Sequence, residues 1–262
     1  MQLEGMRALI TGAGSGIGQA LAIEGARRNM RLALVGRRLE PLQQTLSLLT
    51  GRGHFAIGAD VTKAMDRSSL AAAIEKRWRS LDILVNNAGI VPVGLLAETA
   101  DDQLQSVIET NLLAPIALVR EALPLLQRQR GSRVVNIGSV LGDIPYPLFA
   151  AYSATKSGLR GFSIAMRREL APLGVGVTYA APRAARTPAS RPLHGLIQPF
   201  NMKLDSPESV AKRIWDAVAR DGDSVYPPGP ERLFVLIQHL LPRLVDRSIA
   251  KQFARVGKLN IS

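Results

Sequence analysis

The chain has 262 residues, of which 47% are hydrophobic and 21% are charged, so it is long enough to bury a sizeable core. It has no cysteine, which excludes disulfides, cysteine zinc sites and thiol nucleophiles, and no metal site is expected. The net charge of +12 would attract nucleic acid or an anionic membrane. However, the basic residues are spread along the chain without interleaved aromatics, so nucleic acid is not an expected partner.

The amino terminus does not have the pattern of an export signal. An acidic residue, Glu4, stands where such a signal needs a basic head, and the apolar run that follows ends at Thr11. No run approaches the roughly 18 apolar residues of a membrane-spanning helix. We therefore expect a cytoplasmic protein.

A short apolar run, residues 7–10, leads into a glycine-rich stretch, residues 11–18, and then into a helical pattern that ends near Asn29. Strand, glycine turn and helix in this order are the context in which a dinucleotide pyrophosphate binds. Glycines let the backbone approach the phosphates, and the first helical turn offers unpaired N–H groups. The stretch predicts a nucleotide site, with an ordinary tight turn as the alternative.

The next apolar run, residues 31–35, ends in Gly36, Arg37 and Arg38. A dinucleotide fold that prefers NAD places an acidic residue near this point to bind the ribose hydroxyls. Two guanidinium groups suit the additional phosphate of NADP instead. We expect NADP in preference to NAD, and a solvated pair of arginines at a helix start is the alternative.

Apolar and helical segments continue to alternate along the chain. Strands are expected at 54–58, 81–85, 133–137, 174–179 and 224–226, and helices at 39–50, about 102–128, about 151–171 and from Pro207 to about Arg220, with Ser206 as an N-cap. This alternation predicts an α/β fold with a doubly wound parallel sheet. His54 is not grouped with acidic residues and is interpreted as structural.

Tyr152 and Lys156 stand four residues apart in a helical segment, so both side chains point from one face. A nearby cation lowers the pKa of a phenol, which makes the pair a proton donor and acceptor usable near neutral pH. Ser139, at the end of the preceding strand, could hold a polarised oxygen beside them. The alternative is a solvated helix face, on which such a pair is an ordinary spacing.

Together these residues resemble the short-chain dehydrogenase/reductase family. The matching positions keep the family's order from residue 6 to about 190, and they are Thr11, Gly12, Gly16, Ile17, Gly18, Asp60, Val61, Asn86, Asn87, Ala88, Gly89, Asn111, Ser139, Tyr152 and Lys156. The resemblance implies a single Rossmann-like domain over residues 1–262. Its parallel sheet would have about seven strands in the order 3-2-1-4-5-6-7, with helices on both faces.

The resemblance also assigns roles. Tyr152 would be the general acid/base, Lys156 would hold the nicotinamide ribose, Ser139 would bind the substrate oxygen, and Asn111 would order a proton relay. Cofactor contacts would come from Thr11, Gly12, Ser15, Gly16, Ile17, Gly18, Arg37, Arg38, Asp60, Val61, Asn87, Ala88, Gly89, Tyr152, Lys156, Pro182 and Thr187. From the residues alone, Asn111 is an amide among apolar neighbours that must find hydrogen-bond partners such as backbone groups.

The chain departs from the family at Pro182-Arg183, where a glycine would follow the proline. Glycine permits close backbone approach, so Arg183 changes the geometry expected beside the nicotinamide. Residues 183–203 are expected to form a mobile substrate loop. A mostly apolar pocket is expected from Leu141, Ile144, Tyr146, Phe149 and Leu193, with Ser139, Leu141, Tyr146 and Tyr152 against the substrate and Asp143 adding charge.

The last stretch, about 230–262, is a basic amphipathic extension. Its apolar stripe, interrupted by Pro242, consists of Leu233, Ile237, Leu240, Leu241, Leu244 and Ile249, and its basic residues are Arg232, Arg243, Arg247, Lys251 and Arg255. Such a segment packs on its own domain, covers a partner subunit or lies on a membrane as a peripheral contact. The pattern does not choose among the three.

The expected function is an NADP-dependent oxidoreductase that interconverts a carbonyl and an alcohol by hydride transfer on a small, hydrophobic ketone or secondary alcohol. The resemblance implies a homodimer or homotetramer built through the two long helices at about 102–128 and 151–171. The alternative is a non-catalytic NADP-binding regulatory protein on the same fold.

Overall fold

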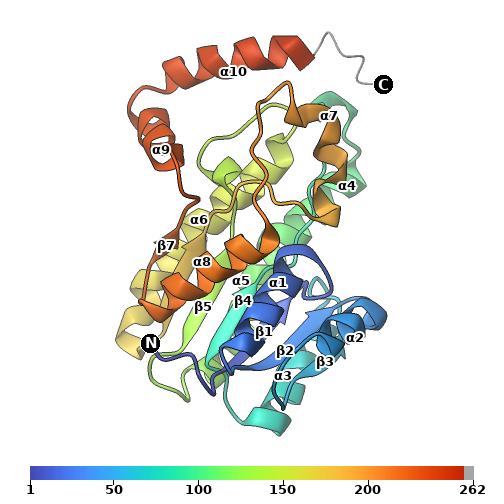
Figure 1. Ribbon diagram of the computed structural model, residues 1–262, viewed down its shortest axis with the longest axis vertical. Coiled ribbons are helices and arrows are strands. Elements are labelled where there is room, and N and C mark those ends of the chain that lie inside the picture. Colours follow the sequence, from blue (N-terminus) through green and yellow to red (C-terminus); the bar gives the residue numbers. More distant parts are fainter. Residues whose placement is uncertain (257–262) are drawn as a thin grey trace.

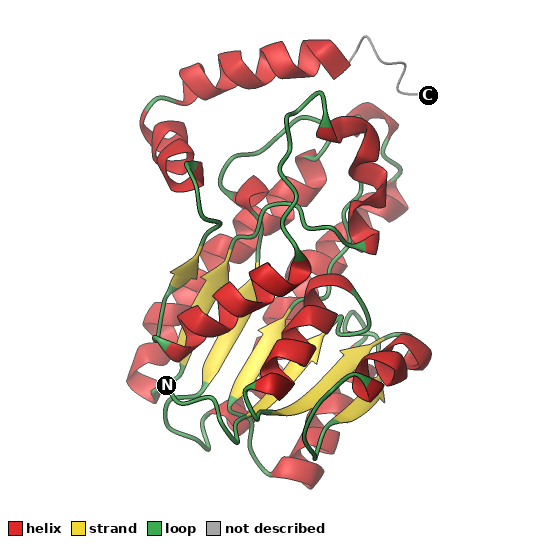
Figure 2. Cartoon of the chain, viewed as in Figure 1, coloured by secondary structure: helices red, strands yellow, loops and turns green. Residues whose placement is uncertain are grey.

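Seven parallel strands form the centre of the computed structural model, which describes residues 1–256 (Figures 1 and 2). The sheet order is β3-β2-β1-β4-β5-β6-β7, as expected for the doubly wound fold. The strands are β1 (Arg7–Thr11), β2 (Arg31–Gly36), β3 (Phe55–Gly58), β4 (Ile83–Asn86), β5 (Arg133–Ile137), β6 (Gly176–Ala180) and β7 (Ser224–Val225).

Helices connect the strands and cover both faces of the sheet. They are α1 (Gly16–Arg27), α2 (Leu39–Ser47), α3 (Ala64–Trp78), α4 (Asp101–Ile108), α5 (Ala114–Leu126), α6 (Ala150–Leu170), α7 (His194–Ile197), α8 (Pro207–Ala219), α9 (Glu231–Leu240) and α10 (Pro242–Val256). Shorter helical turns are η1 (Leu96–Glu98), η2 (Glu109–Leu113), η3 (Val140–Gly142), η4 (Ala171–Leu173) and η5 (Pro188–Leu193).

Alternate residues of each strand supply two separate hydrophobic cores, because successive side chains of a strand point to opposite faces. In β1, Ile10 packs with α1, α2 and α8 on one face, whereas Leu9 packs with α3, α5 and α6 on the other. Both side chains are almost completely buried. The strands are therefore almost continuously apolar in sequence because both faces of the sheet are buried.

The long helix expected at about 102–128 is two helices, α4 and α5, joined by the π-helical turn η2. A π turn inserts an extra residue into the helix and often occurs at functional sites. Here it carries Asn111, whose amide pairs with the backbone of Ile90 instead of facing solvent. The remaining expected elements are present with ends shifted by a few residues, and Ser206 caps α8 by accepting a hydrogen bond from the Ser209 N–H at 3.2 Å.

Residues 183–203, expected to be a loop without regular structure, are helical over residues 188–197. They contain η5 and α7, and their apolar side chains Leu193, Leu196 and Phe200 are buried in a third hydrophobic cluster. A parallel bridge between Ala185 and Asp205 closes the segment at its base. The sequence lacked a helical period because the two helical pieces are only a few residues long.

Helices α9 and α10, residues 231–256, are here called the C-terminal arm. The arm lies at the end of the molecule to which the carboxyl ends of the strands point, and α10 crosses the top of the view in Figure 1. Pro242 separates the two helices and starts α10, as the interrupted stripe predicted. The side chain of Arg255 and residues 257–262 of the expected extension lie outside the described residues. Within residues 1–256 no helix has the length and apolar character needed to cross a membrane.

Candidate active site

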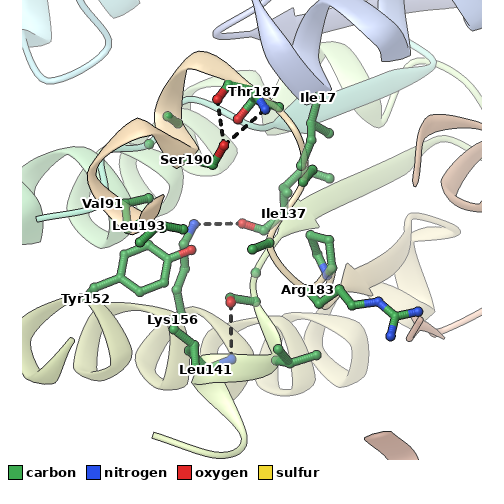
Figure 3. Close-up of a pocket in the computed structure, with 18 of the residues that line it drawn as sticks. Ile17, Val91, Ile137, Leu141, Tyr152, Lys156, Arg183, Thr187, Ser190 and Leu193 are labelled. Carbon is green, nitrogen blue, oxygen red and sulfur yellow. Dashed lines mark hydrogen bonds between the residues drawn. The ribbon is translucent and has the colours of Figure 1, made fainter. Parts of the chain in front are cut away.

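A cavity of about 600 Å³ opens at the carboxyl ends of the central strands, where open α/β sheets bind ligands (Figure 3). Most of the predicted site residues line it, namely Gly12, Ser15, Gly16, Ile17, Asn87, Ala88, Gly89, Ser139, Leu141, Tyr146, Tyr152, Lys156, Pro182 and Thr187. Thr11, Gly18, Arg37, Arg38, Asp60, Val61 and Asn111 do not line it. The topology thus gathers segments that are up to 175 positions apart in the sequence, from Gly12 to Thr187.

One wall of the cavity is the glycine turn between β1 and α1. Gly12 and Gly16 have positive φ values of 65° and 57°, which favour glycine. A Cβ atom on Gly18 would lie 2.2 Å from the carbonyl oxygen of Gly12, so no side chain fits there. The turn therefore presents bare backbone and the amino end of α1 to the cavity, which fits the pyrophosphate of a dinucleotide.

Thr11 and Asn87 tie this turn to the end of β4. The Thr11 hydroxyl oxygen accepts the N–H groups of Asn87 and Ala88, both at 3.0 Å, and the Asn87 amide donates to the Thr11 carbonyl oxygen at 2.9 Å. Thr11 is only 2% exposed and lies behind the cavity wall. Its place in the structure is therefore that of a support for the cofactor wall.

Arg37 and Arg38 follow β2 and are exposed to solvent. Burial opposes the ionisation of nearby Asp60, but hydrogen bonds from Thr62 and the charges of Arg37 and Lys63 outweigh it and lower the pKa of Asp60. The end of β2 therefore carries free guanidinium groups beside an ionised carboxylate. The residues after this strand include no acid at the position where NAD-preferring folds have one.

Tyr152, Lys156 and Ser139 converge on the opposite wall, and all three are buried. The Lys156 ammonium donates to the Ile137 carbonyl oxygen at 2.8 Å and lies 5.7 Å from the centre of the Tyr152 ring. Ser139 follows β5 in an extended conformation, and its hydroxyl oxygen accepts the Leu141 N–H at 3.1 Å. The helical spacing and the strand end thus bring a phenol, an ammonium and a hydroxyl to one place.

Burial controls the proton affinities of the pair. It raises the pKa of Tyr152 to about 12, with a hydrogen bond from the Ser139 side chain acting in the opposite direction. It lowers the pKa of Lys156 to about 8. The expected net lowering of the pKa of Tyr152 is therefore not what this arrangement produces, because loss of hydration disfavours the charged form of the phenol and outweighs the opposing effect.

Asn111 is fully buried in η2. Its Oδ1 accepts the Ile90 N–H and its Nδ2 donates to the Ile90 carbonyl oxygen, each at 2.9 Å. The interpretation made from the residues alone, that Asn111 is a buried amide hydrogen-bonded to backbone groups, is therefore confirmed. A Cβ atom on Gly89 would lie 3.2 Å from Asn111 Oδ1 and 3.7 Å from Lys156 Nζ, so the glycine keeps the space between the two side chains open.

Tyr179, which the sequence did not single out, supports from β6 the wall that carries Ser139 and Lys156. Its hydroxyl donates to the carbonyl oxygens of Ser139 at 3.3 Å and Lys156 at 3.5 Å. A Cβ atom on Gly138 would lie 2.2 Å from the Tyr179 ring, so the glycine before Ser139 is required by this packing. A tyrosine in a buried strand was the available signal, because its hydroxyl must find a partner.

The other end of the cavity is mostly apolar, as predicted, and is lined by Leu141, Tyr146, Phe149, Leu193, Phe200 and Phe234. Ile144 is not among the lining residues, which corrects the prediction. Asp143 adds no charge to the cavity, since its buried carboxylate pairs with Arg160 at 2.8 Å and accepts the Tyr226 hydroxyl. Phe200 lies in the expected substrate loop but was not singled out, and Phe234 was missed because no local pattern brings residue 234 to the site.

Arg183 reaches the edge of the cavity but turns its guanidinium away from Tyr152 (Figure 3). The guanidinium binds Asp205 at 2.9 Å, Glu231 at the start of α9, and the Pro228 carbonyl oxygen at 3.0 Å. The departure from glycine thus joins residues 183–203, here named the substrate segment after their expected role, to the C-terminal arm. The departure at position 183 is visible in the sequence but its partners are not, because both acidic residues lie more than twenty positions away.

Comparison with known proteins agrees with this geometry. The family model of short chain dehydrogenases matches residues 6–195. Among curated proteins, 3-oxoacyl-(acyl-carrier-protein) reductase FabG of Escherichia coli is 35% identical over 193 residues, which are 74% of this chain and 79% of that protein. The mouse 3-oxoacyl-(acyl-carrier-protein) reductase is 38% identical over 184 residues, which are 70% of this chain and 77% of that protein.

Solved structures share the fold over almost the whole chain. A short-chain dehydrogenase from Streptomyces avermitilis has 28% identity and a TM-score of 0.81, covering 97% of this chain and 99% of the other. A short-chain dehydrogenase/reductase from Burkholderia phymatum in complex with NAD has 24% identity and a TM-score of 0.85, covering 93% and 96%. The Burkholderia phymatum structure, at this lower identity, shows agreement in fold alone.

Proposed function

Because this chain belongs to the short-chain dehydrogenase/reductase family of oxidoreductases, which act on carbonyl and alcohol groups, we propose that it reduces a hydrophobic ketone with NADPH or oxidises the corresponding secondary alcohol. The observation that carries the proposal is the convergence of Tyr152, Lys156 and Ser139 on one wall of the cavity. The wall opposite is the bare glycine turn. An acid/base group and a dinucleotide cradle thus face the same space.

NADPH held against the glycine turn would supply the hydride for the carbonyl carbon in the proposed reduction. The Tyr152 hydroxyl donates its proton to the carbonyl oxygen, which Ser139 orients by a hydrogen bond. With a pKa raised to about 12, Tyr152 is protonated at neutral pH and ready to act as the acid. The Lys156 ammonium, held by the Ile137 carbonyl oxygen, stabilises the phenolate that remains.

The apolar end of the cavity supports a hydrophobic substrate. Leu141, Tyr146 and Phe149 line it, and Tyr146 packs edge-on against Phe200 at 5.4 Å between ring centres. Burial of such surfaces favours a ligand with an aliphatic or aromatic body. The curated relatives are 3-oxoacyl reductases by name, which agrees with an elongated acyl-like ketone as the substrate class.

Replacement of Tyr152 by Phe tests the catalytic role. We expect kcat for reduction of a hydrophobic ketone to fall by about 10²- to 10⁴-fold, the usual contribution of a positioned acid. NADPH binding, followed by quenching of protein fluorescence, should change little because the ring is retained. Turnover equal to that of the unmodified protein would contradict the role. Undetectable turnover by the unmodified protein across a broad ketone screen would favour a non-catalytic NADP-binding protein.

Replacement of Arg37 by Ala tests the cofactor preference. The guanidinium is exposed at the end of β2, where a ribose 2′-phosphate would lie in this fold. A charge-assisted hydrogen bond contributes enough that we expect NADPH affinity to fall by roughly 10- to 100-fold. NADH affinity should stay within about twofold, since that cofactor lacks the phosphate. An equal loss for both cofactors, measured by titration, would show that Arg37 does not read the phosphate.

A homodimer or homotetramer and a cytoplasmic location remain predictions. The surface expected for assembly, formed by α4, η2, α5 and α6, has Ile108 48% exposed and Leu113 56% exposed. Apolar side chains exposed on paired helices support burial against a second copy. Size measurement by sedimentation, repeated with Leu113→Glu, tests the assembly.

A further inference from the structure

Large apolar side chains are concentrated on the C-terminal arm. Of the fourteen that are exposed in the described part of the chain, six fall within residues 233–244, so this short segment is an unusual apolar surface. Leu233, Leu236 and Leu240 are 57%, 53% and 68% exposed, and their spacing of three and four residues puts them on one face of α9. Leu241 and Leu244 continue the exposed surface into α10.

The second helix of the arm adds a basic face. Arg243, Arg247 and Lys251 are exposed and recur every four residues, so they form one stripe along α10. The two helices contain two acidic residues, Glu231 and Asp246. Glu231 is already paired with Arg183, so only Asp246 can offset the charge of the basic stripe. An apolar face beside a stripe of cations is the pattern by which amphipathic helices bind anionic membranes.

The arm is held in place at both helices. In α9, the guanidinium of Arg183 binds Glu231 and also Asp205 at the base of the substrate segment. In α10, Ile249 is buried, and Phe253 packs against the apolar cluster that contains Leu193 and Phe200. Because these attachments use one side of the arm, the leucines and the basic stripe are presented outward.

The arm also forms part of the cavity entrance. Pro230, Glu231 and Phe234 line the cavity, and the Phe234 side chain is at the same time 49% exposed. Phe234 therefore lies at the rim, and the exposed leucines of α9 begin at its neighbour Leu233. A surface that covers these leucines would lie directly beside the opening.

A second copy of the chain fits this surface poorly. In a twofold contact the same patch meets itself. The stripe of Arg243, Arg247 and Lys251 would then face like charges, with Asp246 as the acid available to offset them. Like-charge juxtaposition opposes association, whereas the head groups of an anionic bilayer complement the same stripe.

From these observations we infer that the C-terminal arm docks on an anionic lipid membrane, with α9 inserted between head groups and the cavity entrance facing the lipid. A ketone or alcohol dissolved in the bilayer would then enter the apolar end of the cavity past Phe234. The substrate half of this inference rests on the proposed function, and the docking half does not.

Vesicle flotation of the full chain tests the docking. We expect the protein to float with vesicles of phosphatidylcholine and phosphatidylglycerol, and much less with phosphatidylcholine alone. The Leu236→Asp/Leu240→Asp variant loses the inserted face, and Arg243→Glu/Arg247→Glu loses the charge complementarity. Each should reduce the bound fraction at a fixed lipid concentration by about tenfold or more.

A matched variant, Arg52→Glu/Lys76→Glu, makes the same change in net charge at exposed positions in the loop before β3 and in α3. It should bind vesicles like the unmodified protein. Insertion of the arm would be overturned if this variant weakened vesicle binding as much as Arg243→Glu/Arg247→Glu does, or if Leu236→Asp/Leu240→Asp still bound vesicles. Either result would indicate general attraction between charges. Absence of vesicle binding together with a dimer that Leu236→Asp/Leu240→Asp dissociates would assign the face to a second copy.

Turnover separates the two halves of the inference. With a bilayer-partitioned long-chain ketone, anionic vesicles should raise kcat/KM for the unmodified protein but not for Arg243→Glu/Arg247→Glu. With a short water-soluble ketone, both proteins should react alike, because these arginines do not line the cavity. Vesicle binding without turnover of either ketone would refute the proposed function and leave the docking supported. Turnover without vesicle binding would refute the docking and leave the proposed function supported.

Discussion

The sheet with its covering helices and the C-terminal arm contrast in how they use apolar residues. In α1 and α8 the apolar side chains are buried, and Trp215 of α8 is completely enclosed. Helix α9 has an equally clear apolar period but no buried residue. An amphipathic helix is thus buried in one region and exposed in the other, and the difference lies in whether another element of the chain covers its apolar face.

The contrast indicates that the two regions are stabilised in different ways. Burial of apolar area stabilises the sheet layers in proportion to the area removed from water. The arm instead depends on a few attachments, chiefly the ion pairs of Arg183 and the packing of Ile249 and Phe253. Substitutions with matched chemistry in the two regions should therefore differ in their effect on folding.

Truncation of Trp215 gives the largest expected effect. Trp215→Ala removes a fully buried indole and its hydrogen bond to the Leu21 carbonyl oxygen at 2.9 Å, which should lower the free energy of unfolding by about 3–5 kcal/mol. Leu240→Ala, in the arm, should change it by less than about 0.5 kcal/mol. Urea unfolding of both variants measures the difference. Similar losses would mean that the leucine face of α9 is covered within the folded monomer.

Removal of the Arg183 guanidinium tests the attachment of the arm. Arg183→Met leaves Glu231 without its partner, whereas Asp205 keeps Arg213. We expect a loss of about 2–3 kcal/mol, below the range for fully buried pairs, because these side chains keep 13% to 17% exposure. Limited proteolysis should then cut between β7 and α9, and KM should rise more than kcat falls.

The matched control for this attachment is Arg213→Met, which removes the other partner of Asp205 and leaves Glu231 paired. It should not expose the chain between β7 and α9 to protease. If both variants release the arm equally, Asp205 and not Glu231 is the group through which Arg183 acts.

Lys156→Met tests whether the stable region contains a destabilised site. Burial lowers the pKa of Lys156 to about 8 from 10.5, so below pH 8 folding holds a charge in an apolar place. The shift corresponds to about 3 kcal/mol, and loss of the bond to Ile137 offsets about 1 kcal/mol of this. We expect the variant to be more stable at pH 7 by about 2 kcal/mol while its turnover is lost.

The pH dependence follows from the same shift. Between pH 8 and 10.5 the unfolded chain binds more protons at Lys156 than the folded chain, so the contribution of this lysine to stability rises with pH in that window. The advantage of Lys156→Met should be full below pH 8 and shrink toward pH 10.5. Thermal unfolding across this range measures it, and an advantage that does not vary with pH would show that the charge is not its origin.

The sequence by itself determined the sheet and most of the cavity wall. Alternating strands and helices predicted the parallel fold, because period and turn chemistry are local properties of the chain. Gly12, Gly16, Tyr152 and Lys156 were predicted to meet because the family resemblance assigns them to one cofactor site, and the structure brings them to one cavity. Their roles in binding and catalysis remain predictions that the substitutions above test.

Three features were decided only by tertiary structure. The pKa values of Tyr152 and Lys156 depend on burial by the whole fold, which opposed the shift expected from helical spacing alone. The partners of Arg183 are Asp205, just beyond the substrate segment, and Glu231 on α9, brought together by contacts distant in sequence. The amphipathic period of α9 could be predicted from the sequence, but the exposure of its apolar face could not. Whether that face is covered depends on where every other element of the chain packs.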